Sequence, residues 1–134
     1  MLPRATVLTP NVPEALVLAG QQHERPEQLA RAIQALGPRA VVITGGHRLQ
    51  ATDVFFDGNR IVELDGERHD GGAAHGSGCT HSSVLAAALA WGDEPLQAAR
   101  FAKEMASRAV ASGLKAIGAG AGPVDVLGLR GRSL

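Results

Sequence analysis

AVVITGG, residues 40–46, is a continuous apolar run that ends in two glycines. A strand that is apolar at every position is typical of a parallel sheet, because helices cover both faces of such a sheet. Helical and strand-like segments alternate on both sides of this run, which is the general pattern of an α/β domain. We therefore expect an α/β fold with a mostly parallel sheet and flanking helices.

The segments nearest this run fit that expectation. Residues 5–9 predict a buried strand, and Asn11 is a natural N-cap for the short helix that follows it. A second helix is predicted from about residue 26 to residue 36, with its apolar side chains on one stripe. Further along, the stretch 52–65 contains two strand-like runs around Asp57-Gly58-Asn59, which is a strong β-hairpin signal.

The second half of the chain predicts two helices and a tail. Residues 66–76 are polar and glycine-rich and predict a loop. Residues 77–91 are helical in pattern and nearly all small and apolar, which suits a central helix packed against a sheet. A helix over about 95–112 has an apolar face and a polar face that includes Lys103. The glycine-rich residues 119–134 predict an irregular tail.

Composition limits the classes of function. The 134 residues, 45% of them hydrophobic, suit one domain over residues 1–134, and the sequence has no internal repeat. Thirteen basic and thirteen acidic residues cancel, and aromatic residues make up only 3%, which argues against a nucleic-acid partner. The longest apolar stretch is too short to span a membrane. Because the N-terminus lacks the pattern of a secretory signal, we expect a cytoplasmic location.

HGSGCTHS, residues 75–82, joins a glycine-rich turn to the predicted start of a helix. Gly76 and Gly78 permit close approach to the backbone, and the free N–H groups and dipole of a helix start favour an anion. The stretch lacks the Lys of a Walker loop and the third glycine of a dinucleotide fingerprint. Hydroxyl groups that could add hydrogen bonds belong to Ser77, Thr80 and Ser82. The alternative is a glycine-rich helix start that binds no ligand.

Cys79 is the only cysteine in the chain, so an internal disulfide and a cysteine-rich zinc site are excluded. In the first turn of a helix the dipole favours the thiolate, and His75 and His81 are close in sequence. A nucleophile needs a base in a geometry that sequence spacing cannot show. Three interpretations therefore stay open: a thiol nucleophile, a small buried residue, and a non-covalent participant in a site.

Two further motifs follow the predicted parallel strands. Asn11 and Glu14 come directly after the first strand, at the edge where open α/β sheets bind ligands. Such a pair can hold Mg²⁺ together with water and phosphate oxygens, although a helix cap is the structural alternative. TGGH, residues 44–47, follows the second strand. Because these motifs and HGSGCTHS converge on one edge, they favour a phosphate-bearing ligand.

Four stretches resemble, in family order, the motifs of the hydroxymethylpyrimidine/phosphomethylpyrimidine kinases of thiamine biosynthesis, within the ribokinase-like superfamily. They are LTPNVPEALVLAG, ALGPRAVVITGGH, HGSGCTHSSVLAAALAWG and GAGAGPVD. The cysteine-containing motif is the most specific, because most ribokinase relatives have aspartate at that position. The resemblance covers nearly all of the chain but only about the C-terminal half of the family. It implies half of a three-layer ribokinase-like fold.

The resemblance also implies ATP-dependent phosphoryl transfer to a pyrimidine hydroxymethyl group and then to its monophosphate. By position, an anion hole around the transferring phosphoryl group would comprise Gly76, Ser77, Gly78 and Cys79. Cys79 would also stand where relatives place the catalytic base. Asn11 and Glu14 match the element associated with Mg²⁺ and phosphate. The residues expected beside the nucleotide are Thr44, Gly45, Gly46, His47 and Thr80.

The sequence departs from the family in three respects. The N-terminal half, which supplies most of the pyrimidine pocket, is absent. Thr44 replaces a lysine, and alanines replace the histidines often found in the GAGAGP stretch. A half-sheet leaves an open strand edge, so we expect a homo-oligomer or a separate N-terminal-half partner. Two hypotheses follow: a kinase that needs acceptor residues from elsewhere, or a non-catalytic nucleotide- or phosphate-binding module or degenerate relic.

Overall fold

The computed structural model of the chain describes residues 1–20, 25–45, 51–69, 73–115 and 117–129. Its elements, in order, are a 3-10 helix (η1, Leu2–Arg4), β1 (Val7–Leu8), α1 (Val12–Leu18), α2 (Pro26–Gln34), β2 (Ala40–Ile43), β3 (Asp53–Phe56), β4 (Ile61–Leu64), α3 (Ser77–Ala90) and α4 (Pro95–Ala111). This order confirms the predicted succession of strands and helices, although β1 is shorter than the strand expected over residues 5–9.

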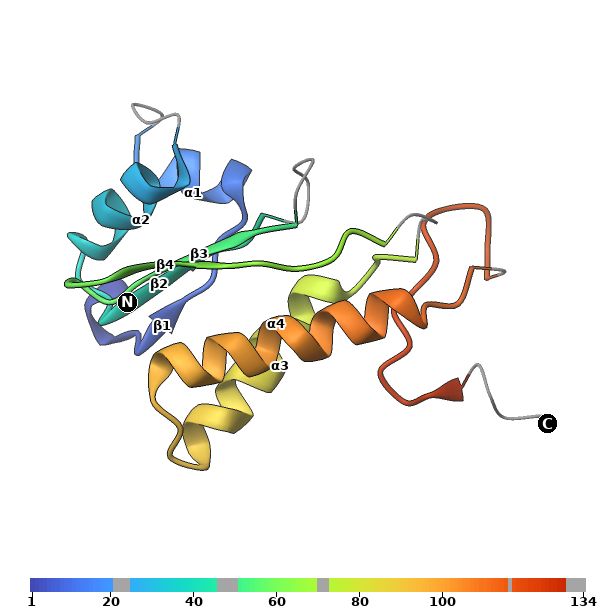
Figure 1. The fold of residues 1–134 in the computed structure, drawn as a ribbon. Helices are drawn as coiled ribbons and strands as arrows, with labels where there is room; N and C mark the ends of the chain where they lie inside the picture. The colour runs from blue at the N-terminus through green and yellow to red at the C-terminus, as the bar shows by residue number, and fades with distance from the viewer. Residues whose placement is uncertain (21–24, 46–50, 70–72, 116, 130–134) are drawn as a thin grey trace.

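The elements form three layers. Figure 1 shows α1 and α2 on one face of the sheet and α3 and α4 on the other. The strand order in the sheet is β1-β2-β3-β4. The predicted α/β class with flanking helices is therefore confirmed.

Parallel pairing extends over only part of the sheet. β1 and β2 are parallel, whereas β3 is antiparallel to both β2 and β4. Among the described residues the expectation of a mostly parallel sheet therefore holds for one strand pair only. The hairpin accounts for the direction of β4 against β3, because two strands joined by a short turn must run in opposite directions.

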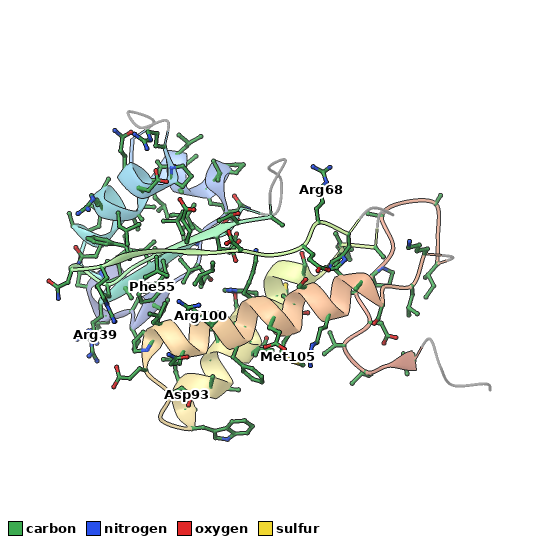
Figure 2. All side chains as sticks on the ribbon, viewed as in Figure 1. Arg39, Phe55, Arg68, Asp93, Arg100 and Met105 are labelled. Carbon is green, nitrogen blue, oxygen red and sulfur yellow. The ribbon has the colours of Figure 1, made fainter. Side chains whose placement is uncertain are left out.

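Each face of the sheet covers its own core. Side chains alternate between the faces of a strand, so Val42 and Phe55 pack toward α3 and α4, whereas Val41 and Phe56 pack toward α1 and α2. Every residue of β2 and β3 is buried. Figure 2 shows Phe55 in the layer between the sheet and the helix pair α3 and α4. The burial of both faces explains why the run at 40–46 is apolar throughout.

The hairpin turn has the chemistry that its sequence predicts. Asp57 Oδ1 accepts hydrogen bonds from the backbone N–H groups of Asn59 at 3.0 Å and Arg60 at 2.8 Å. Gly58 has a positive φ of 92°. The hydrogen bond from the Arg60 backbone is the main reason that the pKa of Asp57 is lowered. The turn therefore fixes the register of β3 against β4 through its own side chain.

The segment after α4 turns back along the start of α3. The Leu114 backbone N–H donates to the Pro123 carbonyl at 2.9 Å, and the Val124 N–H donates to the His75 carbonyl at 3.0 Å. The Asp125 N–H donates to the carbonyl of Ala109, in α4, at 2.9 Å. The bond between Val124 and His75 holds the backbone just before Gly76, the N-cap of α3.

No helix in the described part of the chain is long and apolar enough to cross a bilayer.

The two-sided core predicts unequal costs for two phenylalanine truncations. Phe55 is fully buried, so Phe55→Ala should lower the free energy of unfolding by about 3–5 kcal/mol. Phe101 is 42% exposed, so Phe101→Ala should cost much less. Urea unfolding followed by circular dichroism measures both. Equal losses in the two variants would contradict the packing described for the sheet.

Candidate functional site

The segments after β1 and β2 meet the start of α3 at one edge of the sheet. Asn11 and Thr44 form a parallel bridge just beyond the ends of the two strands, and the Thr44 N–H donates to the Pro10 carbonyl at 2.9 Å. Thr9 Oγ1 and Ser82 Oγ lie 3.1 Å apart, which joins the end of β1 to α3. The structure therefore brings together the three motifs that the sequence places at this edge (Figure 1).

The first turn of α3 is open to solvent. Its N-cap, Gly76, has a left-handed conformation with φ 87°, and no side chain caps the helix. A helix leaves the N–H groups of its first turn without intrahelical acceptors. Gly78 and Cys79 are both exposed there, and a β-carbon at Gly78 would meet no atom within 4 Å. This arrangement can bind an anion with backbone N–H groups and the helix dipole.

Two hydroxyl groups near this turn already have partners. Thr80 is 9% exposed, and its hydroxyl donates to the Gly76 carbonyl at 3.0 Å. Ser82 is paired with Thr9. Contacts of Thr80 with a nucleotide therefore stay a prediction, and a ligand at the turn would meet backbone groups first.

Cys79 is free and exposed, so its interpretation as a small buried residue is wrong. Among the described residues its thiol has no hydrogen-bonding partner. His81, which is close to it in sequence, is only 4% exposed and lies near Asp53 instead. A covalent mechanism needs a base within hydrogen-bonding reach of the thiol. His81 is therefore not placed as a base for Cys79, and a non-covalent role for this thiol stays a prediction.

Asn11 and Glu14 form a capping box at the start of α1. Asn11 Oδ1 accepts from the Glu14 N–H at 2.9 Å, and Glu14 Oε2 accepts from the Asn11 N–H at 3.0 Å. The structural alternative, a helix cap, is thus present. In the described part of the chain no three His, Cys, Asp or Glu side chains group closely enough to hold a metal ion. A role for this pair toward Mg²⁺ stays a prediction.

The TGGH turn is described only in part. Gly46 and His47 lie outside the described residues. Gly45 is buried, and a β-carbon there would overlap the Thr52 carbonyl oxygen, so only glycine fits. Its N–H donates to Asp53 Oδ1 at 2.8 Å. The turn after β2 is therefore held against the start of β3.

Sequence reasoning missed a buried cluster behind this edge. Asp53, at the start of β3, is 2% exposed, and its Oδ1 lies 2.8 Å from Lys103 Nζ. Asp53 Oδ2 lies 3.9 Å from His81 Nε2. The prediction that Lys103 belongs to the polar face of its helix is wrong, because its side chain is only 13% exposed and reaches the sheet. The available signal was Asp53 itself, a carboxylate opening an otherwise apolar strand.

His81 is held neutral by its surroundings. Burial is the largest influence and lowers its pKa; the Asp53 carboxylate opposes this, and the Lys103 ammonium adds to it. Neither ring nitrogen has a hydrogen-bond partner among the described residues. The ring therefore fills space beside the ion pair, in the second turn of α3.

A separate cavity of about 450 Å³ lies between the end of β4 and α4. Its charged lining residues are Asp65, Glu67, Arg100, Lys103, Glu104 and Arg108. Equal numbers of acidic and basic groups give this lining no net preference for an anion. None of the site residues predicted from the sequence lines it.

One family model matches most of the chain, and the relatives that it resembles are kinases. Residues 1–125 match the family model described as phosphomethylpyrimidine kinase. The chain is 40% identical over 132 residues to a hydroxymethylpyrimidine/phosphomethylpyrimidine kinase of Rhizobium meliloti, covering 92% of this chain and 49% of that one. It is also 40% identical over 117 residues to a pyridoxine kinase of Bacillus subtilis, covering 82% of this chain and 43% of that protein.

Solved structures of kinases superpose on the chain. A Bacillus subtilis pyridoxal kinase in complex with ADP superposes with a TM-score of 0.88 at 36% identity, over 98% of this chain and 51% of that one. A ribokinase of Thermotoga maritima superposes with a TM-score of 0.68 at 21% identity, over 79% of this chain and 36% of that one, which shows the shared fold. The chain spans about half the length of the curated relatives it matches.

The buried His81 predicts a loss of stability in mild acid. Its pKa is lowered from 6.5 in the folded chain, so below that pH the unfolded chain binds a proton that the folded chain does not. The free energy of unfolding should be at its full value above about pH 6.5 and should decline as the pH falls below it. Urea unfolding at a series of pH values measures the decline.

Two variants separate this effect from the rest of the protein. His81→Phe should flatten the decline, because it removes the buried titrating group. His75→Gln is the control, since His75 is exposed, and it should leave the slope unchanged. A slope that is the same in His81→Phe and in the unaltered chain would contradict this assignment.

Proposed function

The chain belongs to the phosphomethylpyrimidine kinase family, and on that premise we propose that it forms the nucleotide-binding half of an ATP-dependent phosphotransferase. The acceptor would be hydroxymethylpyrimidine or its monophosphate. The activity requires acceptor-site residues from another polypeptide segment, because the chain spans about half of its relatives.

The open first turn of α3 is the observation that supports this proposal best. It lies at the edge where the segments after β1 and β2 end, with Gly78 and Cys79 exposed. Phosphoryl transfer depends on positioning and charge neutralisation more than on covalent chemistry. The backbone N–H groups of Gly76, Gly78 and Cys79 would stabilise the negative charge on the transferring group, while the N–H of Ser77, the fourth expected member of the anion hole, donates to the Ala74 carbonyl at 3.1 Å. Cys79 would take part there without forming a covalent bond.

The donor set near α1 fits a magnesium ion that keeps most of its water. The capping box uses the single side-chain oxygen of Asn11 and one of the two carboxylate oxygens of Glu14, and the Glu14 side chain is exposed at the start of α1. Mg²⁺ is usually bound through one or two carboxylates together with water and substrate phosphates. When bound, Mg²⁺ supplies positive charge against the phosphates. Asn11 and Glu14 would hold its water shell at the sheet edge.

The nucleotide part of the proposal draws on two relatives. The Bacillus subtilis pyridoxal kinase was solved with ADP, and a Staphylococcus aureus pyridoxal kinase with AMP-PCP. Thr44 and Gly45 follow β2, at the sheet edge that α3 also reaches through Ser82. The family resemblance implies that these two residues, Gly46, His47 and Thr80 bind the nucleotide. A cytoplasmic location stays a prediction from the sequence.

A non-catalytic nucleotide- or phosphate-binding module is the second candidate function. Thr44 favours it, because a lysine expected at this position from the family resemblance would add a positive charge beside the phosphates. Such a module would bind ATP at the same edge and transfer nothing.

The surface beside β1 is where acceptor-site residues from another segment would pack. In the described part of the chain β1 pairs only with β2, which leaves its other edge open. The helix α3 contains no Asp, Glu, Lys or Arg, and Ala86, Ala87 and Ala90 are exposed on it. An open strand edge and an uncharged helix face are typical of a surface that another chain or segment covers. We propose an N-terminal half here, with a second copy of this chain as the alternative.

A pair of variants at Gly78 tests the anion site. Gly78→Asp places a carboxylate in the open turn, so it should weaken Mg-ATP binding at least about tenfold relative to Gly78→Asn, which has the same shape without the charge. Both should fold, because the space beside Gly78 is free. Calorimetry measures binding. Absence of ATP binding by the unaltered chain, or equal binding by the two variants, would contradict the proposed site.

Complementation separates the kinase from the module. The chain mixed with Mg-ATP and hydroxymethylpyrimidine phosphate should show no turnover alone, and should show turnover when the N-terminal half of the Rhizobium meliloti relative is added. Ala87→Glu should weaken this rescue by charging the uncovered face of α3, whereas Gln97→Glu, at a site on α4 that is also exposed, should not. ATP binding with no turnover in the mixture would favour the non-catalytic module.

A further inference from the structure

Asp53 joins three segments of the chain behind the candidate site. Its Oδ1 accepts hydrogen bonds from the Gly45 backbone N–H at 2.8 Å and from Lys103 Nζ at 2.8 Å. Gly45 belongs to the turn after β2, Asp53 opens β3, and Lys103 lies in α4. One carboxylate oxygen thus connects the turn, the sheet and the helix layer. Figure 1 shows that β3 and α4 belong to neighbouring layers.

An ion pair at this depth is not explained by stability alone. The side chains of Asp53 and Lys103 are 3% and 13% exposed. The free energy needed to remove two charges from water offsets much of the free energy gained from their attraction. Apolar residues of similar volume often serve a core equally well. A buried pair of this kind is better explained by the geometry that it imposes on its neighbours.

The geometry that it imposes is that of the Gly45 backbone. The pairing of β2 with β3 ends at Ile43 and Val54, so the sheet ladder offers no acceptor to the buried N–H of Gly45. Asp53 supplies that acceptor. On the other side, the Thr52 carbonyl lies so close that no β-carbon fits at position 45. The turn is therefore held between the Thr52 backbone and the Asp53 carboxylate.

His81 extends the same cluster to α3. Its Nε2 lies 3.9 Å from Asp53 Oδ2, too far for a hydrogen bond. The ring is in van der Waals range of the carboxylate, two positions after Cys79. Asp53 therefore stands directly behind both the turn after β2 and the start of α3.

We propose that Asp53 is a positioning residue: with Lys103 as its counter-ion, its carboxylate fixes the backbone of the Thr44–Gly45 turn against the sheet. The consequence for nucleotide binding rests on the function proposed above, because that turn would lie beside the nucleotide. The hydrogen bond between Asp53 and Gly45 is independent of it. The two parts are therefore measured separately.

Two double variants isolate the hydrogen bond from the charge. Asp53→Asn with Lys103→Met removes both charges and keeps a side-chain oxygen that can accept from Gly45. Asp53→Leu with Lys103→Met removes both charges and the acceptor. Neither leaves a buried charge without its partner. Asp57→Asn with Arg60→Met, an exposed pair in the hairpin turn, is the control for losing an Asp–cation pair.

Amide hydrogen exchange, measured by NMR without any ligand, tests the positioning itself. The Gly45 amide should exchange at least about tenfold faster in the Leu/Met variant than in the unaltered chain, with the amides of β2 unchanged. In the Asn/Met variant and in the control, Gly45 should keep its protection. Equal protection of Gly45 in the Leu/Met and Asn/Met variants would overturn the proposal.

A second measurement needs no substitution and so holds even if the Leu/Met variant does not fold. The scalar coupling across a hydrogen bond should be detected between the Gly45 amide nitrogen and the Asp53 carboxyl carbon in the unaltered chain. Its absence would overturn the proposal. Loss of protection at Gly45 together with a detected coupling supports it.

Mg-ATP titration of the same proteins then tests the consequence. Binding should weaken at least about tenfold in the Leu/Met variant and change little in the Asn/Met variant. If the unaltered chain binds no ATP, the proposed function fails, and the exchange and coupling measurements still decide the role of Asp53. If both double variants bind ATP as the unaltered chain does, the turn does not govern nucleotide binding and the proposal is overturned in that part.

Discussion

The burial of β2 and β3 between two helical layers is the constraint on which the rest of the structure depends. Because every side chain of these strands is enclosed, the turns and helix starts that follow them are forced to the ends of the sheet. The parallel pairing of β1 with β2 places two such ends together, and the Thr9–Ser82 contact joins the start of α3 to them. The candidate site is thus positioned by the buried strands and by the sheet edge at which β1 and β2 end.

Asp53 is the exception to that apolar layer, and its position explains why it is tolerated. It lies at the first residue of β3, where the ladder with β2 has ended and a buried N–H needs an acceptor. Lys103 supplies the balancing charge from α4. The same edge therefore contains an ordered interior carboxylate on one side and, on the other, an open helix turn able to receive an anion.

Most of the architecture could be predicted from local sequence pattern. A short window of sequence is enough to indicate the strand at 40–46, the turn at Asp57-Gly58-Asn59 and the helix over 77–91. The convergence of three motifs was also predictable, since parallel strands end at one edge. The Asp53–Lys103 pair was not, because it joins residues 50 positions apart and nothing local marks Lys103 as buried. The capping box is the opposite case, because the helix cap that the sequence offers as the alternative for Asn11 and Glu14 is present in the structure.

The central claim is that the open first turn of α3 binds the phosphates of a nucleotide. Titration of the isotope-labelled chain with Mg-ATP, followed residue by residue through backbone amide NMR signals, tests it most directly. The account predicts the largest shifts at Gly78 and Cys79, followed by Thr44 and Gly45. Shifts confined to the residues that line the cavity between β4 and α4, such as Arg100 and Ser107, would contradict it.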